Sequence, residues 1–267
     1  MTKIGILGCA GRMGQMLVRE VLSTPGAELA GGTERVGGDA AGRDLGVLVG
    51  RGELGLTIGV DPKTLFETSD AVIDFTSPEA TVQHAALAAE TRTVHVVGTT
   101  GLSSEQEAAL KAAATRTAVV WAPNMSVGVN LLLSLVEQVA RTLDPSYDIE
   151  IVEMHHRHKV DAPSGTALGL GRAAAAGRNV ALQDVWCKSR DGLTGARPVG
   201  EIGFATLRGG DVVGDHTVVF AAEGERIELT HKASSRQVFA KGAVRAALWA
   251  HGKPPGLYSM RDVLELG

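Results

Sequence analysis

The sequence predicts an α/β fold: a doubly wound, mostly parallel sheet, then a second α+β domain with a mixed or antiparallel sheet. In the first part of the chain, short apolar runs alternate with segments of helical apolar spacing. Such alternation is typical of βα units, and continuous apolar strands are typical of a parallel sheet buried on both faces. Beyond residue 125, strand patterns with period two favour antiparallel pairing.

The composition narrows the class of protein. The chain has 267 residues, enough for two ordinary domains, and 44% of them are hydrophobic. A formal net charge of -4 argues against a general nucleic-acid binder. Cys9 and Cys187 form no C-x-x-C pair, so we expect reduced thiols. The chain enters a strand pattern without a leader, and residues 127–139 are too short and too polar to span a bilayer. We therefore expect a cytoplasmic protein with no membrane partner.

The elements of the first part follow in order. Ser77 and Pro78 indicate the N-cap and first position of a helix, and Ser103 or Ser104 can cap the next one. Residues 36–69 are glycine-rich and irregular, and we expect loops there with one or two short strands. Strands are expected at 3–7, 28–33, 71–75, 94–97 and 118–121, and helices at 16–22, 77–90 and 103–114.

The second part begins after Ala122-Pro123-Asn124. We expect helices at 126–142, 165–176 and 236–251, the last of them ended by Pro254-Pro255. Strands are expected at 147–154, 200–207, 212–221 and 226–232. The last two strands flank a Glu223-Gly224-Glu225 turn, which predicts a hairpin.

A glycine-rich turn, Gly8-x-x-Gly11-x-x-Gly14, joins the first strand to the first helix. Glycines at such a turn let the backbone approach a pyrophosphate, and the helix N-terminus offers free N–H groups to it. Glu34 lies 20 residues beyond Gly14, where an acidic residue can accept from ribose hydroxyls, while Arg35 could meet a 2′-phosphate. The pattern favours a Rossmann-like dinucleotide domain, although glycine-rich turns also serve packing alone.

Two further loops follow strands of the predicted sheet. They are Gly98-Thr99-Thr100-Gly101 and Ala122-Pro123-Asn124-Met125. Ligands of open α/β sheets bind beyond the carboxyl ends of the strands, so both loops could touch the nicotinamide end of a dinucleotide. The alternative is ordinary turn chemistry.

Residues 153–167, EMHHRHKVDAPSGTA, gather five basic side chains in a chain of acidic total charge. Arg157 and Lys159 put fixed positive charge beside the histidines, which disfavours a metal site. The run lacks interleaved aromatics, which disfavours nucleic acid. A loop of solvated charged side chains is the simplest alternative. It explains one lysine or arginine easily, but it explains three histidines in four positions less easily.

An anion pocket explains more of this run. An extended strand would place His155, Arg157 and Lys159 on one side, and Ser164 would cap the next helix. The N–H groups of the following Gly165 and Thr166 would then suit a carboxylate. Histidine titrates near neutral pH, and a lysine among cations can have a lowered pKa. We expect a small carboxylate substrate that is reduced by a dinucleotide and protonated by the protein.

The chain resembles the 4-hydroxy-tetrahydrodipicolinate reductase (dihydrodipicolinate reductase) family of lysine and diaminopimelate synthesis. The resemblance rests on GCAGRMG, GTTG, APNMSVGVN, EMHHRHKVDAPSGTA, IGFATLRGGDVVGDHTVVF and THKASSRQVFAKGAVRAALW, which occur in order along nearly the whole chain. It implies reduction of a small cyclic dicarboxylate by NADH or NADPH, with loss of water. Glu34 and Arg35 favour opposite cofactors, so the preference stays open.

The resemblance also implies roles for residues and domains. His155 would be the main acid-base residue, Lys159 a proton donor, and His156, Gly165 and Thr166 carboxylate ligands. Residues 1–126 and 237–267 would form the dinucleotide-binding domain, and 127–236 a substrate-binding domain that assembles a homotetramer. The implied cofactor-binding residues are Gly8, Cys9, Ala10, Gly11, Arg12, Met13, Glu34, Arg35, Gly98, Thr99, Thr100, Ala122, Pro123, Asn124 and Met125.

Two rival functions remain open at the level of the residues. Another dehydrogenase with the same dinucleotide domain would not need the HHRHK run followed by Ser-Gly-Thr. A non-catalytic dinucleotide sensor would need the glycine turn but no proton donors beside a carboxylate clamp.

Overall fold

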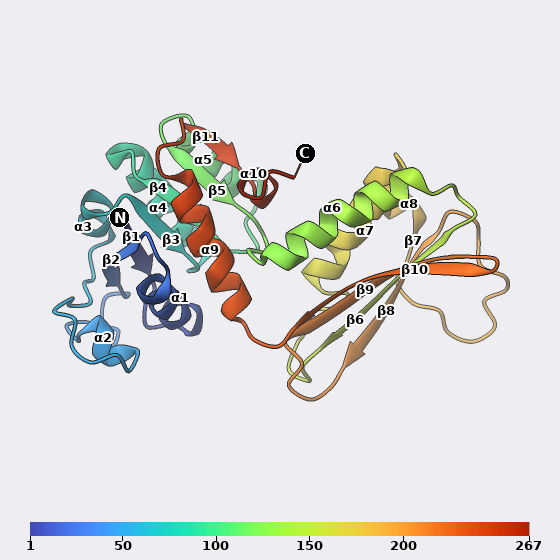
Figure 1. Cartoon of the computed structure of the whole chain (residues 1–267), viewed down its shortest axis with the longest axis horizontal. Coiled ribbons are helices and arrows are strands. Elements are labelled where there is room, and N and C mark those ends of the chain that lie inside the picture. Colours follow the sequence, from blue (N-terminus) through green and yellow to red (C-terminus); the bar gives the residue numbers. More distant parts are fainter. Residues whose placement is uncertain (267) are drawn as a thin grey trace. The chain divides into compact units, whose positions relative to one another are not determined.

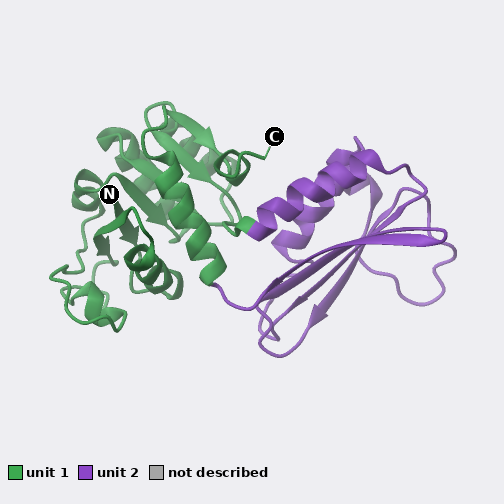
Figure 2. Cartoon of the chain, in the orientation of Figure 1, with its two compact units in different colours: residues 1–127, 237–267 green, residues 128–236 purple. Residues whose placement is uncertain are grey.

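The computed structural model describes residues 1–266. The chain divides into two compact units, Met1–Val127 with Gln237–Gly267, and Gly128–Arg236 (Figure 2). The last long helix therefore returns to the first unit, a long-range return that local residue patterns do not reveal.

Unit 1 is built on a six-stranded sheet in the order β11-β5-β4-β3-β1-β2 (Figure 1). Every strand pair in it is parallel, which confirms the predicted doubly wound sheet. The strands are β1 (Thr2–Leu7), β2 (Ala27–Thr33), β3 (Ala71–Asp74), β4 (Val94–Val97), β5 (Ala118–Trp121) and β11 (Gly256–Tyr258).

Two layers of helices cover this sheet. One layer holds α1 and α9, whose apolar side chains pack on Ile4, Ile6, Ile73 and Val120. The other face buries Val72 and Val119 against helices α3, α4 and α5. The helices of unit 1 are α1 (Arg12–Ser23), α2 (Leu45–Leu48), α3 (Pro62–Thr68), α4 (Pro78–Thr91), α5 (Ser104–Ala113), α9 (Gln237–Ala250) and α10 (Met260–Val263).

The predicted helix caps of α4 and α5 are confirmed. The Ser77 hydroxyl accepts from the N–H of Ala80, and Pro78 takes the first helical position. Ser103 caps α5 in a reciprocal capping box with Gln106. These caps satisfy N–H groups that the helix itself leaves without partners.

The expectation for residues 36–69 was right about the loops and wrong about the short strands. The segment forms the helices α2 and α3 and makes only isolated bridges, Thr33–Gly59 and Asp44–Thr57, instead of strands. The Asp44 carboxylate organises the segment by accepting from the N–H groups of Gly46, Val47, Leu54 and Leu56. Helices this short carry too little apolar periodicity to be recognised, and the same holds for β11 and α10 after the Pro-Pro pair.

Unit 2 carries a five-stranded mixed sheet in the order β10-β9-β6-β8-β7. β6 pairs parallel with β8 and antiparallel with β9, and β9 and β10 form the predicted hairpin. The elements are α6 (Val127–Thr142), β6 (Asp148–His155), α7 (Gly165–Gly177), α8 (Leu182–Val185), β7 (Trp186–Cys187), β8 (Ile202–Arg208), β9 (Gly214–Ala222) and β10 (Glu225–Ala233).

The core of unit 2 lies between this sheet and the helices α6 and α7 (Figure 1). Burial alternates residue by residue along β6, so Ile149, Ile151, Glu153 and His155 share the covered face.

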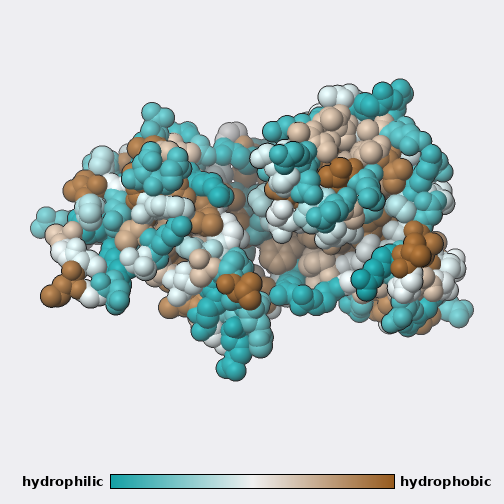
Figure 3. Space-filling view, turned by 180° about the vertical axis from the view of Figure 1, so that it is seen from behind, coloured by the Kyte–Doolittle hydropathy of each residue, from teal (hydrophilic) through white to brown (hydrophobic). Residues whose placement is uncertain are grey.

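In the space-filling view, hydrophilic side chains cover much of the visible face, with smaller apolar patches between them (Figure 3). No helix within residues 1–266 is both long and apolar enough to cross a bilayer.

Candidate active site

Glu153 and His155 form a buried ionisable pair near the end of β6. Oε2 of Glu153 lies 2.5 Å from Nδ1 of His155, and both residues are less than 10% exposed. Arg208, the register partner of His155 on β8, grips the same carboxylate with two hydrogen bonds of 2.8 and 3.0 Å. The N–H of Ser164 donates to Oε1 of Glu153 at 3.0 Å. The Glu153 carboxylate therefore connects β6, β8 and the start of α7 through hydrogen bonds.

The surroundings of this pair set its protonation. Burial alone would raise the pKa of Glu153, but hydrogen bonds from Arg208, His155 and Ser164 outweigh it, and the pKa lies below its usual value. Burial lowers the pKa of His155, and Lys159 and Arg208 lower it further, against the opposing effect of Glu153. An ionised Glu153 can only accept a hydrogen bond, so it favours the tautomer of His155 that carries hydrogen on Nδ1 and leaves Nε2 without one.

His216 lies on β9, and its ring contacts the ring of His155. The two rings lie edge to face with centroids 5.0 Å apart, and Nε2 of His216 lies 3.2 Å from the hydroxyl of Ser164. Burial, followed by the charge on His155, lowers the pKa of His216 to about 4. His216 is therefore neutral at neutral pH and adds no positive charge beside His155.

The predicted strand does not continue beyond His155. Residues 156–163 form a turn and loop, so the alternation expected for Arg157 and Lys159 was wrong. The N–H of His156 donates to the carbonyl of Val212 instead of extending the ladder. The charge of Lys159 nevertheless lowers the pKa of both His155 and His216, and its Nζ lies 2.8 Å from Oδ1 of Asp161.

The carboxylate ligands implied by the resemblance lie around the same turn. Ser164 caps α7, as predicted, by accepting from the N–H of Ala167 at 3.1 Å. Gly165 is exposed and opens that helix, followed by Thr166. His156 is partly buried, and its Nε2 lies 3.5 Å from a guanidinium nitrogen of Arg236. A helix start, a histidine and an arginine thus surround this turn, which suits an anion.

Unit 1 contains a cavity of about 550 Å³ at the carboxyl ends of its strands. The glycine turn and the end of β2 meet there, since Gly8, Gly11, Glu34 and Arg35 all line the cavity. Sequence reasoning missed the third wall, which is formed by the start of α3, the segment after β3 and the first turns of α4. Its residues are Pro62, Phe75, Thr76, Ser77, Ala80 and His84. That wall had a usable signal, because residues 75–77 follow a predicted parallel strand as the other loops do.

The glycine turn fits a dinucleotide on structural grounds. Gly8 has a φ of +61°, and a Cβ at Gly14 would lie 2.1 Å from the carbonyl oxygen of Gly8. The N-cap of α1, Gly11, has no capping side chain, and the first turn has no acidic residue. The N–H groups at this helix start can therefore face phosphate.

The other predicted cofactor residues differ in exposure and in their distance along the chain from the cavity lining: some are exposed, some lie in the core, and some follow other strands. Arg12 is exposed and opens α1, while Ala10 and Met13 are partly buried against the core. Cys9 and Met125 point into the core, and burial raises the pKa of the Cys9 thiol to about 12, so both can offer a ligand only their backbone. Gly98, Thr99, Thr100 and Ala122–Asn124 lie at the carboxyl ends of β4 and β5 but do not line the cavity. Glu34 accepts from the N–H of Arg35 at 2.8 Å.

A buried carboxylate that sequence reasoning missed connects two of these loops. Asp74 is fully buried at the end of β3, where Oδ2 lies 2.8 Å from Nδ1 of His84 and 3.3 Å from Nε2 of His95. Its Oδ1 accepts from the hydroxyls of Thr76 at 2.6 Å and Thr99 at 3.4 Å. Burial alone would raise the pKa of Asp74, but the two histidines outweigh it and hold the pKa far below its usual value.

Comparison with known proteins places both units in one family. The model described as "Dihydrodipicolinate reductase, N-terminus" matches residues 2–125, and that described as "Dihydrodipicolinate reductase, C-terminus" matches residues 128–264. The chain belongs to the dihydrodipicolinate reductase family. As a member of it, the chain is an oxidoreductase with a pyridine-nucleotide cofactor.

Individual relatives cover nearly the whole chain. The chain is 59% identical to the 4-hydroxy-tetrahydrodipicolinate reductase of Dinoroseobacter shibae over 98% of both chains. It is 58% identical to that of Methylocella silvestris, over 99% of this chain and 97% of the relative. Among solved structures, the dipicolinate-bound dihydrodipicolinate reductase from Paenisporosarcina sp. TG-14 is similar with a TM-score of 0.79 and 25% identity over 97% of each chain.

Proposed function

We propose that this protein reduces 4-hydroxy-tetrahydrodipicolinate to tetrahydrodipicolinate in lysine and diaminopimelate biosynthesis. The reaction consumes one NADH or NADPH and one proton and releases one water. Family membership and the curated relatives support this reaction. The observation that carries it is the buried Glu153–His155 pair beside the Ser164-capped start of α7, which offers a proton-transfer group next to an anion-binding helix start.

In this proposal, residues of unit 2 bind the substrate and move protons. His156, Gly165 and Thr166 hold its carboxylates. His155 exchanges a proton through Nε2, since its Nδ1–H donates a hydrogen bond to Glu153. Lys159 is the second proton donor, beside the hydroxyl that leaves as water.

Residues of unit 1 would hold the cofactor, which supplies a hydride when bound. The glycine turn, Gly8 to Met13, would meet the pyrophosphate. Glu34 and Arg35 would meet the adenosine ribose, so we propose that the enzyme accepts both NADH and NADPH. Gly98, Thr99 and Thr100, together with the Ala122–Met125 loop, would position the nicotinamide end.

The reaction is tested by following absorbance at 340 nm. Freshly condensed pyruvate and aspartate semialdehyde are supplied with NADH or NADPH in separate cuvettes. Substrate-dependent loss of absorbance is expected with both cofactors. Folded protein that binds dinucleotide but oxidises neither cofactor would contradict the reductase function and favour the sensor.

Variants separate the enzyme from the sensor. His155→Gln and Lys159→Met are each expected to lower kcat by about 100-fold or more, as loss of an acid-base group does, while dinucleotide binding is unchanged. His158→Gln, in the same basic run but exposed, is the matched control and retains wild-type kcat. A full rate in both His155→Gln and Lys159→Met would remove the proposed roles.

We also propose that the protein acts in the cytoplasm as a homotetramer, as the family resemblance implies. Multi-angle light scattering of the purified chain tests the assembly, and a mass of one or two chains would contradict it. Fractionation of the producing cells tests the compartment.

A further inference from the structure

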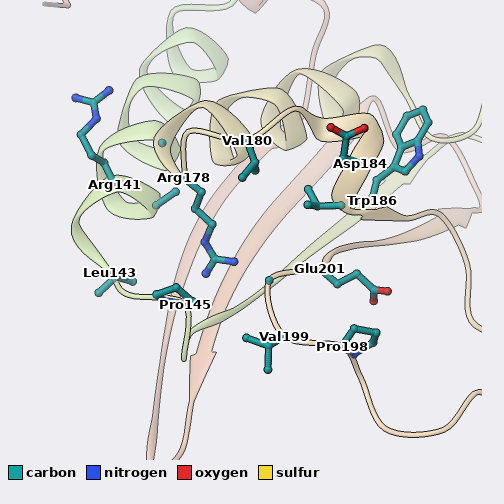
Figure 4. Close-up of a pocket in the computed structure, with 14 residues that line it drawn as sticks. Arg141, Leu143, Pro145, Arg178, Val180, Asp184, Trp186, Pro198, Val199 and Glu201 are labelled. Atoms are coloured by element: carbon teal, nitrogen blue, oxygen red, sulfur yellow. The ribbon is translucent and has the colours of Figure 1, made fainter.

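Unit 2 contains a second cavity, of about 600 Å³, which lies outside the proposed substrate site (Figure 4). It is bounded by the C-terminal ends of α6 and α7, by α8 and by the segment 198–201. None of the residues around His155 lines it. Its volume falls within the range of roughly 300–1,000 Å³ that is usual for small-molecule sites.

Arg178 is the unusual group in this cavity. Figure 4 shows its side chain reaching from the end of α7 toward Pro145 and Val199. Nη2 donates to the backbone oxygen of Tyr147. Nε and Nη1 are shielded from solvent, and no group within residues 1–266 accepts a hydrogen bond from them. A buried donor without a partner destabilises the folded chain, and a charged donor does so more strongly.

The charge of Arg178 is also poorly balanced. No carboxylate in the described part of the chain forms an ion pair with it, whereas Arg190 pairs with Glu150 and Glu201. Burial lowers the pKa of Arg178, and the charge of Arg197 lowers it further, against the opposing charges of Asp148 and Asp144. A negative ligand would therefore gain a charge-assisted hydrogen bond without competing with an existing partner.

The remaining lining defines the ligand more closely. Leu143, Val185 and Val199 supply apolar walls, while Asp184 and Glu201 add two carboxylates to the lining. These two acidic groups disfavour a doubly charged anion such as phosphate. We propose that this cavity binds a small monocarboxylate with an apolar body, whose carboxylate pairs with Arg178. The site does not depend on the proposed reaction.

Isothermal titration of the whole chain tests this site with indole-3-acetate and its neutral analogue indole-3-acetamide. Saturable binding of the carboxylate is expected, with binding of the amide weaker by about tenfold, the usual effect of losing one charged hydrogen bond. Arg178→Gln is expected to remove this difference between the two probes. Arg141→Gln is the matched control, because Arg141 lines the same cavity but is 65% exposed and pairs with Glu137 on its own helix.

A second variant guards against loss of folding in Arg178→Gln. Val199 is 81% exposed, so Val199→Glu leaves the core intact while placing a negative charge at the cavity. This variant is expected to bind indole-3-acetate about tenfold more weakly and to bind indole-3-acetamide with unchanged affinity. Absence of saturable binding, equal affinity for acid and amide, or insensitivity to both variants would each overturn the site. Because binding is measured without turnover, its failure is distinct from failure of the reductase function.

Discussion

Oε2 of Glu153 lies 2.5 Å from Nδ1 of His155, two residues further along the same face of β6. Residues two apart in a strand point to the same face, which brings these side chains together. Arg208 and the N–H of Ser164 donate further hydrogen bonds to the Glu153 carboxylate. Glu153 is therefore a positioning residue that holds one tautomer of His155.

Glu153→Gln is expected to move the titration of His155 to lower pH. Glu153 raises the pKa of His155 against burial, so removing its charge lets the pKa fall further. The corresponding inflection in the pH profile of kcat/KM should move the same way, with a lower kcat. Glu150→Gln, on the opposite face of β6 and paired with Arg190, is the control. An unmoved inflection in Glu153→Gln would reduce Glu153 to a packing role.

Asp74→Asn is expected to weaken dinucleotide binding by about tenfold and to destabilise the fold by roughly 3 kcal/mol. The carboxylate connects Thr76, in the wall of the cavity of unit 1, with Thr99 in the loop after β4, so its loss frees both loops. Fluorescence titration with NADH and chemical denaturation measure the two effects. Asp70→Asn is the control, because Asp70 lies just before the opposite end of β3 and accepts from the N–H of Lys3. Unchanged affinity would show that these loops keep their positions without Asp74.

The pair Glu34 and Arg35 is expected to set the ratio of the two cofactors. Arg35→Ala should raise the KM for NADPH by about tenfold with little effect on NADH, because it removes the cation available to a 2′-phosphate. Glu34→Gln should weaken the binding of NADH and strengthen that of NADPH. It replaces a charged ribose acceptor with a weaker neutral one and removes a charge that repels the 2′-phosphate. Initial rates measured at 340 nm give the KM of each variant for NADH and for NADPH. Equal changes for both cofactors in Arg35→Ala would place the 2′-phosphate site elsewhere.

His216 is expected to destabilise the fold as the pH falls from 6.5 toward 4. Its pKa is lowered to about 4 in the folded chain, so the unfolded chain binds an extra proton in this window and gains stability from it. The free energy of unfolding falls by on the order of 3 kcal/mol across this window, at about 1.4 kcal/mol per unit of pH. Urea denaturation across this range should show a shallower dependence in His216→Gln. Parallel curves for the two proteins would contradict a buried neutral His216.

Local patterns were sufficient where the periodicity is long or the cap is chemically distinct. The parallel strands β1 to β5, the long helices and the Ser77, Ser103 and Ser164 caps could all be predicted. The helices α2 and α3 could not, because a few residues carry no resolvable period and Asp44 stabilises the segment through contacts up to 12 residues away.

The sequence by itself determined the two kinds of sheet, the glycine turn and the grouping of His155, Lys159 and the Ser164 helix start, because each depends on neighbouring residues and their spacing. Only the tertiary structure decided which distant groups complete these features. Arg208 and His216 reach His155 through strand pairing, and His84, His95 and Thr99 reach Asp74 through the packing of separate βα units. Such contacts depend on register and burial across the fold, which no local spacing encodes.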